Sequence, residues 1–160
     1  MALIVMNLKY SWHMDFKKIL LIIVFILLAT VGKVFSQLTD DVIIIANEIG
    51  TTSLTKKQLT AYAKGEKNFW TNNKKVIITL PSAKSELATS VAKSIYKTTA
   101  SGMQKYWLSL VFQGRADPPL FFATDEEVIK YVQNNKGAIG FINSKNKALA
   151  ESLFIDVKAD

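Results

Sequence analysis

Two hydroxyl-rich loops are the parts of this sequence whose residue types best suit binding chemistry. They read ANEIGTTS, residues 46–53, and PSAKSE, residues 81–86. Each loop follows an apolar run that predicts a strand and precedes a predicted helix. The free N–H groups and the positive dipole end of a helix N-terminus bind phosphate or sulfate well. The alternative is that Thr55 and Ser82 only cap their own helices, as threonine and serine commonly do.

Residue types that catalyse reactions or hold metals are scarce. The chain has no cysteine, and its single histidine, His13, lies in a segment that we expect to be removed. The remaining chain therefore lacks the parts of a Ser-His-Asp triad, a thiol nucleophile or a His/Cys zinc site. Glu126 and Glu127 are adjacent and do not face each other on a helix, and no glycine-rich nucleotide-binding loop occurs. We expect no enzyme activity, no metal and no cofactor.

The stretch DFKKILLIIVFILLATVGKVFSQ, residues 15–37, has the order of a secretory signal peptide. Lys17 and Lys18 precede an uncharged run over residues 19–31. The residues VFS then offer small or compact side chains before a cut after Ser36. This pattern predicts export of the chain.

Lys33 ends the apolar run too early for a membrane-spanning helix, which needs about 20 apolar residues. We therefore expect residues 1–36 to be a cleaved signal peptide and residues 37–160 to form a single domain, as the length allows. An uncleaved leader that anchors the chain in a membrane is the alternative.

The charge of the chain is moderately basic. The net charge is +7, and cleavage after residue 36, which removes four lysines and one aspartate, leaves +4. A mild positive excess favours anions or anionic surfaces. The lysines are scattered, without the dense basic and aromatic stripe of nucleic-acid-binding proteins. We expect no nucleic-acid partner, and membrane contact only through a retained leader.

Strands and helices alternate along the exported part. Apolar runs at residues 41–47, 74–82, 138–142 and 152–157 predict four strands. Such alternation predicts an α/β domain with a mainly parallel mixed sheet flanked by helices. In these sheets, ligands favour the loops that leave the carboxyl ends of the strands.

Capping boxes predict the starts of two helices. Thr55 and Gln58 open a helix over residues 56–64, and Thr124 and Glu127 open another that ends before NNKG.

Apolar spacing predicts the other two helices. The first contains Leu87, Val91 and Ile95, and Ser82 is placed to cap it. The apolar stripe of the second consists of Met103, Tyr106, Trp107, Leu110 and Val111.

The order of these motifs resembles the phosphate-binding, PstS-like family of periplasmic solute-binding proteins, especially its short, single-lobe members. The resemblance covers residues 41–143, and its most specific parts are the YW helix that runs into GRADPP and the ending VQNNKGAIGF. It implies one lobe of a type II periplasmic-binding-protein fold, where full-length members close two lobes on the anion. It also implies a periplasmic, non-enzymatic protein that binds phosphate or a similar oxyanion for an ABC transporter.

The resemblance further implies an oxyanion site built from hydroxyls and backbone amides of the two loops. The residues that it assigns are Asn47, Thr51, Thr52, Ser53, Ser82 and Ser85. This chain has Ser85 where short members have an arginine, and Ala88 where they have a phenylalanine. Lys84 is then the remaining positive charge, a point charge without the bidentate fork of arginine.

Arg115 is the only arginine in the chain and stands in the GRxxPP turn. We expect its side chain to fix this turn by bonding helix-end carbonyls or by pairing with Asp117 or Asp125, or to contact a partner. Direct contact with the anion is the alternative.

A second hypothesis is a periplasmic adaptor that uses the same fold to bind a protein complex of the cell envelope. A single lobe leaves its ligand half exposed, and four hydrogen bonds of about 0.5 to 1.5 kcal/mol each give only millimolar affinity. Phe69 and Trp70, together with Arg115, are candidate interface residues, because aromatic side chains anchor interfaces. The other interpretation of Trp70 is packing over the end of the sheet.

Overall fold

The computed structural model describes residues 41–160 of the chain. The predicted signal peptide, residues 1–36, lies outside these residues. Within the described part, no helix is long and apolar enough to cross a membrane.

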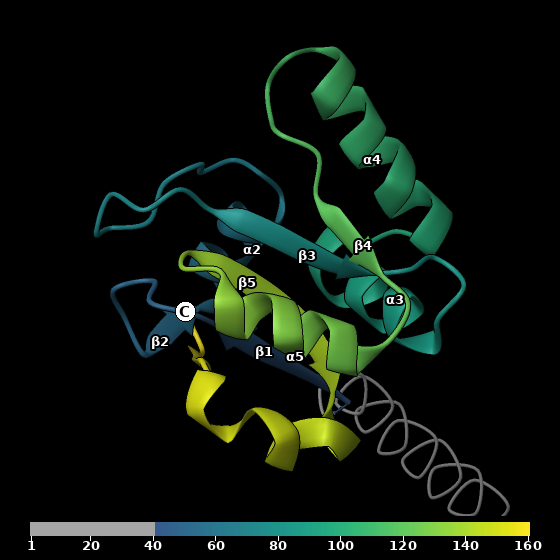
Figure 1. The fold of residues 1–160 in the computed structure, drawn as a ribbon. Coiled ribbons are helices and arrows are strands. Elements are labelled where there is room, and N and C mark those ends of the chain that lie inside the picture. Colours follow the sequence, from purple (N-terminus) through teal and green to yellow (C-terminus); the bar gives the residue numbers. More distant parts are fainter. Residues whose placement is uncertain (1–40) are drawn as a thin grey trace, which may run out of the picture. The chain divides into compact units, whose positions relative to one another are not determined.

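Four strands form the central sheet in the order β1-β5-β3-β4. They are β1 (Val42–Ala46), β3 (Ile77–Pro81), β4 (Leu120–Phe122) and β5 (Ala138–Asn143). Strands β3, β4 and β5 run parallel, whereas β1 runs antiparallel to β5. The sheet is therefore mixed and mainly parallel, as predicted (Figure 1).

The predicted last strand, residues 152–157, is wrong in both its start and its place. Ser144–Leu153 form the 3-10 helix η2, and strand β6 spans Asp156–Lys158. β6 pairs in parallel with β2 (Ser53–Thr55), a strand that was not predicted, in a separate two-stranded sheet. β2 and β6 are far apart in the sequence, so no local sequence pattern predicts their pairing.

Between residues 41 and 160, four α-helices connect or follow the strands. They are α2 (Lys56–Ala63), α3 (Glu86–Val91), α4 (Ala100–Phe112) and α5 (Asp125–Asn134). α3 continues directly into a π-helical segment, η1 (Ala92–Tyr96).

Both predicted capping boxes are confirmed. The Thr55 hydroxyl accepts a hydrogen bond from the Gln58 N–H, and the Gln58 side chain accepts one from the Thr55 N–H, at 3.2 and 2.9 Å. Thr124 and Glu127 make the same reciprocal pair at 3.3 and 3.2 Å. Each box satisfies N–H groups that a first helical turn leaves unbonded, and so fixes where α2 and α5 begin.

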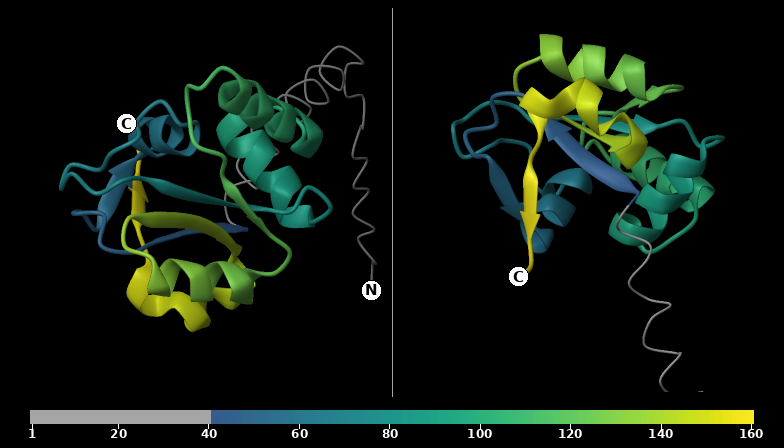
Figure 2. Two further views of the ribbon diagram at one scale, coloured as in Figure 1. Left: turned by 45° about the horizontal axis from the view of Figure 1, so that its top comes forward. Right: turned by 90° about the horizontal axis from the view of Figure 1, so that it is seen from below.

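Helices cover both faces of the sheet, as the right-hand view of Figure 2 shows. One face packs against α2, α3, η1 and α4. Its inward side chains are Ile44, Ala46, Ile78, Leu80, Ile139 and Phe141. The other face, with Ile45, Ala138 and Ile142, packs against α5 and η2. Because both faces are buried, the strands read as continuous apolar runs, which is what made them visible in the sequence.

Candidate functional site

The structure places the two hydroxyl-rich loops at opposite edges of the sheet. We call residues 47–53 the first loop and residues 82–85 the second loop. Ala46 and Ile78 both pair with Ile139, but β1 ends there, whereas β3 continues away from it. Ser82 is four residues beyond Ile78, so the loops are separated by about 13 Å of strand. The expectation that both loops share one site is therefore corrected, because a single phosphate does not span this distance.

Asn47, in the first loop, is used to hold the chain together. Its side-chain amide donates to the carbonyls of Val132 and Gln133, both at 2.9 Å, and so closes the end of α5. Its backbone N–H donates to Ala138 at 3.0 Å, and its carbonyl accepts from Gly137 at 2.7 Å. Asn47 thus joins β1 to the start of β5 and has no donor left for an anion.

The hydroxyl residues of the first loop differ in their bonding. The Thr51 hydroxyl donates to the Ser53 carbonyl at 2.9 Å and accepts from the Ser53 N–H at 3.2 Å. Ser53 itself pairs with Asp156 in the small sheet. The Thr52 side chain is exposed and makes no hydrogen bond to another described residue.

Glu48 gives the first loop a negative charge. Its carboxylate forms ion pairs with Lys74 and with Lys136, the latter at 2.9 Å. Hydrogen bonds from Lys74, and after it from Lys136, hold the pKa of Glu48 below its usual range. A hollow of about 330 Å³ beside Glu48 is lined by Thr51, Thr52 and the end of η2. The Glu48 carboxylate lines this hollow and opposes the binding of an anion there.

In the second loop, the structure assigns the helix cap to Ser85 and not to Ser82. The Ser85 hydroxyl accepts from the Ala88 N–H at 3.1 Å and donates to the Ser82 carbonyl at 2.9 Å. The Ser82 N–H donates to the Phe122 carbonyl at 2.7 Å, which extends the pairing of β3 with β4 past Pro81. Ser82 therefore still belongs to the sheet, and α3 cannot begin until Ser85.

Several donors of the second loop remain free. The Ser82 hydroxyl and the backbone N–H groups of Ala83, Lys84, Glu86 and Leu87 make no hydrogen bond to any residue in the range 41–160. The Lys84 ammonium is exposed and takes part in no ion pair of that range. This group of donors lies where β3 ends and α3 begins, at the carboxyl edge of the three parallel strands, a common place for ligands.

The neighbouring helix start, that of α5, is surrounded by its own carboxylates. The Glu127 side chain accepts from the N–H groups of Ala123 and Thr124. Asp125 accepts from the Asn143 N–H and the Asn146 side chain, both at 2.8 Å. Both helix starts at this edge keep backbone N–H groups that are unbonded within residues 41–160, but at α5 three acidic side chains oppose an anion. The sequence gives one signal for this difference: α5 opens with three acidic residues.

The structure separates the two aromatic interface candidates. Phe69 is 61% exposed and is available to a partner. Trp70 is only 2% exposed, stacks on Tyr62 and donates its indole N–H to the Gly137 carbonyl at 2.8 Å. This corrects the assumption that Trp70 is an exposed contact, because it packs at the first-loop edge of the sheet.

Arg115 fixes its turn through its backbone. Its N–H donates to the Leu110 carbonyl, and the Gly114 N–H donates to Val111, both at 3.0 Å. With Gly114 at a φ of 65°, this is a Schellman motif that ends α4. The guanidinium reaches only the Gln113 side chain, at 3.5 Å.

The expected side-chain partners of Arg115 are engaged elsewhere. Asp117 pairs with Lys75 at 2.7 Å, and Asp125 holds Asn143 and Asn146. The charge of Arg115 is therefore left exposed at the end of α4.

Comparison with known proteins identifies the fold. No family model matches the sequence, and no curated protein matches it significantly. PstS from Borrelia burgdorferi matches with a TM-score of 0.56 and 19% identity, over 74% of this chain and 47% of that chain. A putative phosphate ABC transporter substrate-binding protein with bound phosphate from Clostridium perfringens matches with a TM-score of 0.54 and 16% identity, over 76% and 45%. An ABC-type phosphate transport receptor from Vibrio cholerae matches with a TM-score of 0.50 and 22% identity, over 76% of this chain and 48% of that chain.

The chain spans a little under half the length of each of these structures. At such low identity the likeness shows the fold. Residues 41–160 thus have the α/β architecture of a single lobe of a periplasmic binding protein, with a mainly parallel sheet flanked by helices.

Proposed function

We propose that this chain is an exported, non-enzymatic solute-binding protein that binds phosphate or a similar oxyanion at the second loop, as a receptor for an ABC transporter. The observation that carries the proposal is the set of free donors in that loop, on a fold shared with phosphate receptors. Donors without an internal partner are ready to bond an oxyanion. The first loop is not part of the proposed site, because it lies at the opposite edge of the sheet and carries the Glu48 carboxylate.

Each group of the second loop has a defined part in this proposal. The N–H groups of Ala83, Lys84 and Glu86 supply directional hydrogen bonds near the positive dipole end of α3. The Ser82 hydroxyl adds a donor, and Lys84 adds a positive charge. Ser85 keeps the loop in shape by capping α3 and does not contact the ion.

The affinity that this site supports is weak. The lobe leaves one side of the ion in water. Net contributions of about 0.5 to 1.5 kcal/mol for each of four hydrogen bonds correspond to dissociation constants from tens of millimolar to tens of micromolar. The Glu86 carboxylate in the first turn of α3 opposes an anion. We therefore expect a dissociation constant near 1 mM, on the order of −4 kcal/mol.

An amide-resolved NMR titration tests the proposal at this affinity. The protein, produced from the whole reading frame, is titrated with phosphate and, at matched pH and ionic strength, with sulfate and chloride. We expect saturable shifts at the amides of residues 83–87, larger for phosphate than for chloride. Shifts that are confined to the first loop, or absent at several tens of millimolar, would contradict the proposed site.

Two variants sharpen this test. Ser82→Ala combined with Lys84→Ala should weaken phosphate binding about tenfold or more, because hydrogen bonds to charged groups contribute about 1.5 to 3 kcal/mol. Thr52→Ala is the matched control, an exposed hydroxyl without an internal partner in the other loop. Equal effects of the two substitutions would mean that binding is not local to the second loop.

Export is tested separately. We expect the protein recovered from the cell envelope to begin at Gln37, which N-terminal sequencing would show. A protein that begins at its first methionine and fractionates with the membrane would support the uncleaved leader.

A further inference from the structure

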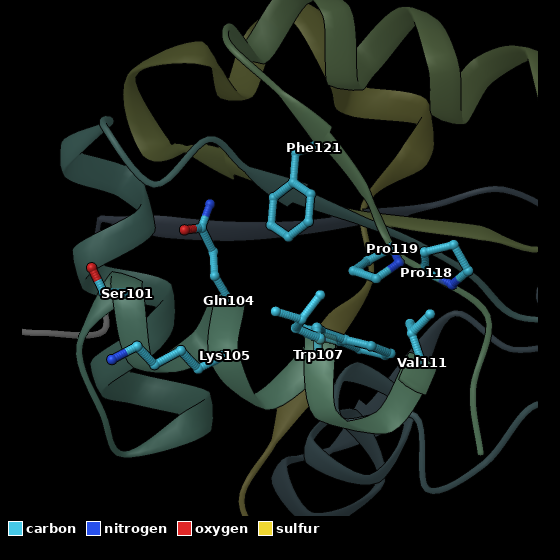
Figure 3. Close-up of a pocket in the computed structure, with 9 residues that line it drawn as sticks. Ser101, Gln104, Lys105, Trp107, Val111, Pro118, Pro119 and Phe121 are labelled. Carbon is cyan, nitrogen blue, oxygen red and sulfur yellow. The ribbon is translucent and has the colours of Figure 1, made fainter. Parts of the chain in front are cut away.

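An apolar groove runs between α4 and the segment that leads into β4. We call it the α4 groove. Its volume is about 460 Å³, within the range of roughly 300 to 1,000 Å³ of pockets that bind ligands. Its lining residues are Ser101, Gln104, Lys105, Trp107, Leu108, Val111, Pro118, Pro119 and Phe121. Figure 3 shows side chains of α4 on one side and Pro118, Pro119 and Phe121 on the other.

The floor of the groove is rigid. Trp107 is 2% exposed and donates its indole N–H to the Tyr96 hydroxyl at 2.8 Å. Tyr96 in turn donates to the Ala63 carbonyl, and burial raises the pKa of Tyr96 above its usual value. Trp107 also packs on Gly65, where an added Cβ would lie 2.9 Å from its ring. Contacts with α2 and η1 thus hold the Trp107 indole in place, so the floor of the groove exists before any partner binds.

Large apolar side chains stand exposed at the rim of the groove. Leu108 is 56% exposed and Phe121 is 42% exposed, and both line it. Phe112, four residues after Leu108 on α4, is 82% exposed. The buried face of α4 consists of Met103, Trp107 and Leu110, so this helix is apolar on both sides. A helix with a second apolar side that a single lobe does not cover has the character of an interface.

The charges around the groove are positive. Lys105 lines it and is the only charged residue of α4. Arg115, just beyond the end of α4, is exposed and makes no ion pair with another residue of the described chain. The nearby carboxylate of Asp117 is already paired with Lys75. An occupant that combines apolar side chains with carboxylates complements this surface.

We propose that the α4 groove docks an apolar, acidic peptide segment of a partner protein. A second copy of this chain fits less well, because α4 has no acidic residue and a symmetric contact would bring the two Lys105 and Arg115 groups into one like-charged interface. The proposal goes beyond the proposed function and does not rest on it, since the second loop takes no part in the groove.

Binding of synthetic peptides to the isotope-labelled protein, produced from the whole reading frame, tests this inference. Three short peptides share one pattern of leucine and phenylalanine at helical spacing and carry glutamate, glutamine or lysine between them. We expect the glutamate peptide to bind about tenfold more tightly than the lysine peptide at low salt, with the glutamine peptide between them. Amide shifts should concentrate in residues 101–112 and 118–122. The phosphate titration of the second loop is run on the same sample, so the two proposals fail independently.

Substitutions in the groove separate charge from apolar contact. Lys105→Glu should reverse the order of the glutamate and lysine peptides without changing the fold, because Lys105 is exposed. Leu108→Asp should abolish binding of all three. Phe69→Asp is the matched control, since Phe69 is equally exposed but does not line the groove. It should leave the affinities unchanged.

Three results would overturn the proposal. The first is equal binding of all three peptides, or of none. The second is a shift pattern outside α4 and β4. The third is a concentration-dependent dimer in light scattering that Leu108→Asp dissociates, which would identify a second copy as the occupant. Reversal of peptide preference in Lys105→Glu, with Phe69→Asp unchanged, would establish it.

Discussion

The first and second loops contain the same kinds of residue, yet they use their polar side chains differently. In the first loop, the side chains of Asn47 and Glu48 bond other parts of the chain, and that of Thr51 bonds Ser53 in the same loop. In the second loop, Ser85 is engaged, but the Ser82 hydroxyl and the Lys84 ammonium make no bond within residues 41–160, where both loops also have unbonded backbone N–H groups. Hydroxyl content alone therefore does not distinguish a binding loop from a structural one; the bonds already made do.

The difference follows from the direction of β1. Because β1 is antiparallel to β5, its end meets the start of β5 and the end of α5, where free carbonyls need donors. Asn47 supplies them. At the other edge the parallel strands end, and each is followed by a helix or turn whose own N–H groups point outward. The first loop is thus a junction between elements, whereas the second loop presents an unpaired hydroxyl and an unpaired ammonium group where the parallel strands end.

Gly137→Ala should have the largest effect on stability, and it tests whether the close backbone contact at the first-loop edge of the sheet is rigid. Gly137 has a φ of 84°, and an added Cβ would lie 2.4 Å from the Lys75 carbonyl oxygen. We expect the free energy of unfolding to fall by about 3 kcal/mol, from the clash and the left-handed backbone together. Chemical denaturation measures this.

Gly114→Ala is the control for that change. Gly114 has a φ of 65° but no neighbouring atom within 4 Å of the added Cβ. It should cost only about 1 kcal/mol, the backbone part alone. Equal losses in the two variants would show that the Gly137 contact does not constrain this edge.

Asn47→Ala tests the junction itself. It removes two hydrogen bonds to the last turn of α5, so we expect a loss of about 1 to 2 kcal/mol in unfolding free energy. Phosphate-induced shifts in the second loop should persist, because the site is at the other edge. Thr52→Ala should change stability by less than about 0.5 kcal/mol. If Asn47→Ala abolished phosphate binding in a folded protein, the separation of the two edges would be refuted.

Ser85→Arg exchanges a structural role for a binding one. Loss of the cap should cost about 1 kcal/mol of stability. Arginine is the residue that short members of the resembling PstS-like family have at this position. Its guanidinium should tighten phosphate binding severalfold. Ser85→Ala, which loses the cap without adding charge, is the control. A thermal melt and the NMR titration measure the two effects, and an unchanged affinity would mean that the guanidinium does not reach the ion.

The smallest expected effect is on the stability of the protein at acidic pH. The pKa of Glu48 is lowered by its hydrogen bonds to Lys74 and Lys136, so its ion pairs stabilise the protein above the ordinary carboxyl pKa. That contribution is lost as the pH falls from about 5 through the lowered pKa of Glu48. Glu48→Gln should remove a small part of the acid dependence of the melting temperature. An identical pH profile of the variant would show that these exposed ion pairs do not contribute to stability.

The features that sequence analysis predicted well are local. In each capping box the two partners are three residues apart, and the apolar stripes of α3 and α4 repeat within a few turns. Both kinds of pattern therefore depend little on the rest of the fold. The mainly parallel sheet followed from the alternation of strands and helices, and the structural neighbours have the expected fold.

What sequence analysis could not predict depends on distant pairing. The direction of β1 is set by β5, and β2 and β6 pair from opposite ends of the domain. The choice between Ser82 and Ser85 as the helix cap was settled by the bond from Ser82 to Phe122 on β4. The α4 groove left a weak signal, since Leu108 and Phe112 lie outside the predicted stripe. Only the tertiary structure shows that they stay exposed among residues 41–160.

The two buried tryptophans give this protein a reporter for each of two regions. Trp107 forms the floor of the α4 groove, and Trp70 lies at the first-loop edge, hydrogen-bonded to Gly137. Both indoles are shielded from water, so both should emit at short wavelength in the native state. Replacing one at a time by phenylalanine, in a background without Trp12, would give a native optical signal for each region. Occupation of the groove and loosening of the junction could then be followed by fluorescence in the same molecule, without any attached label.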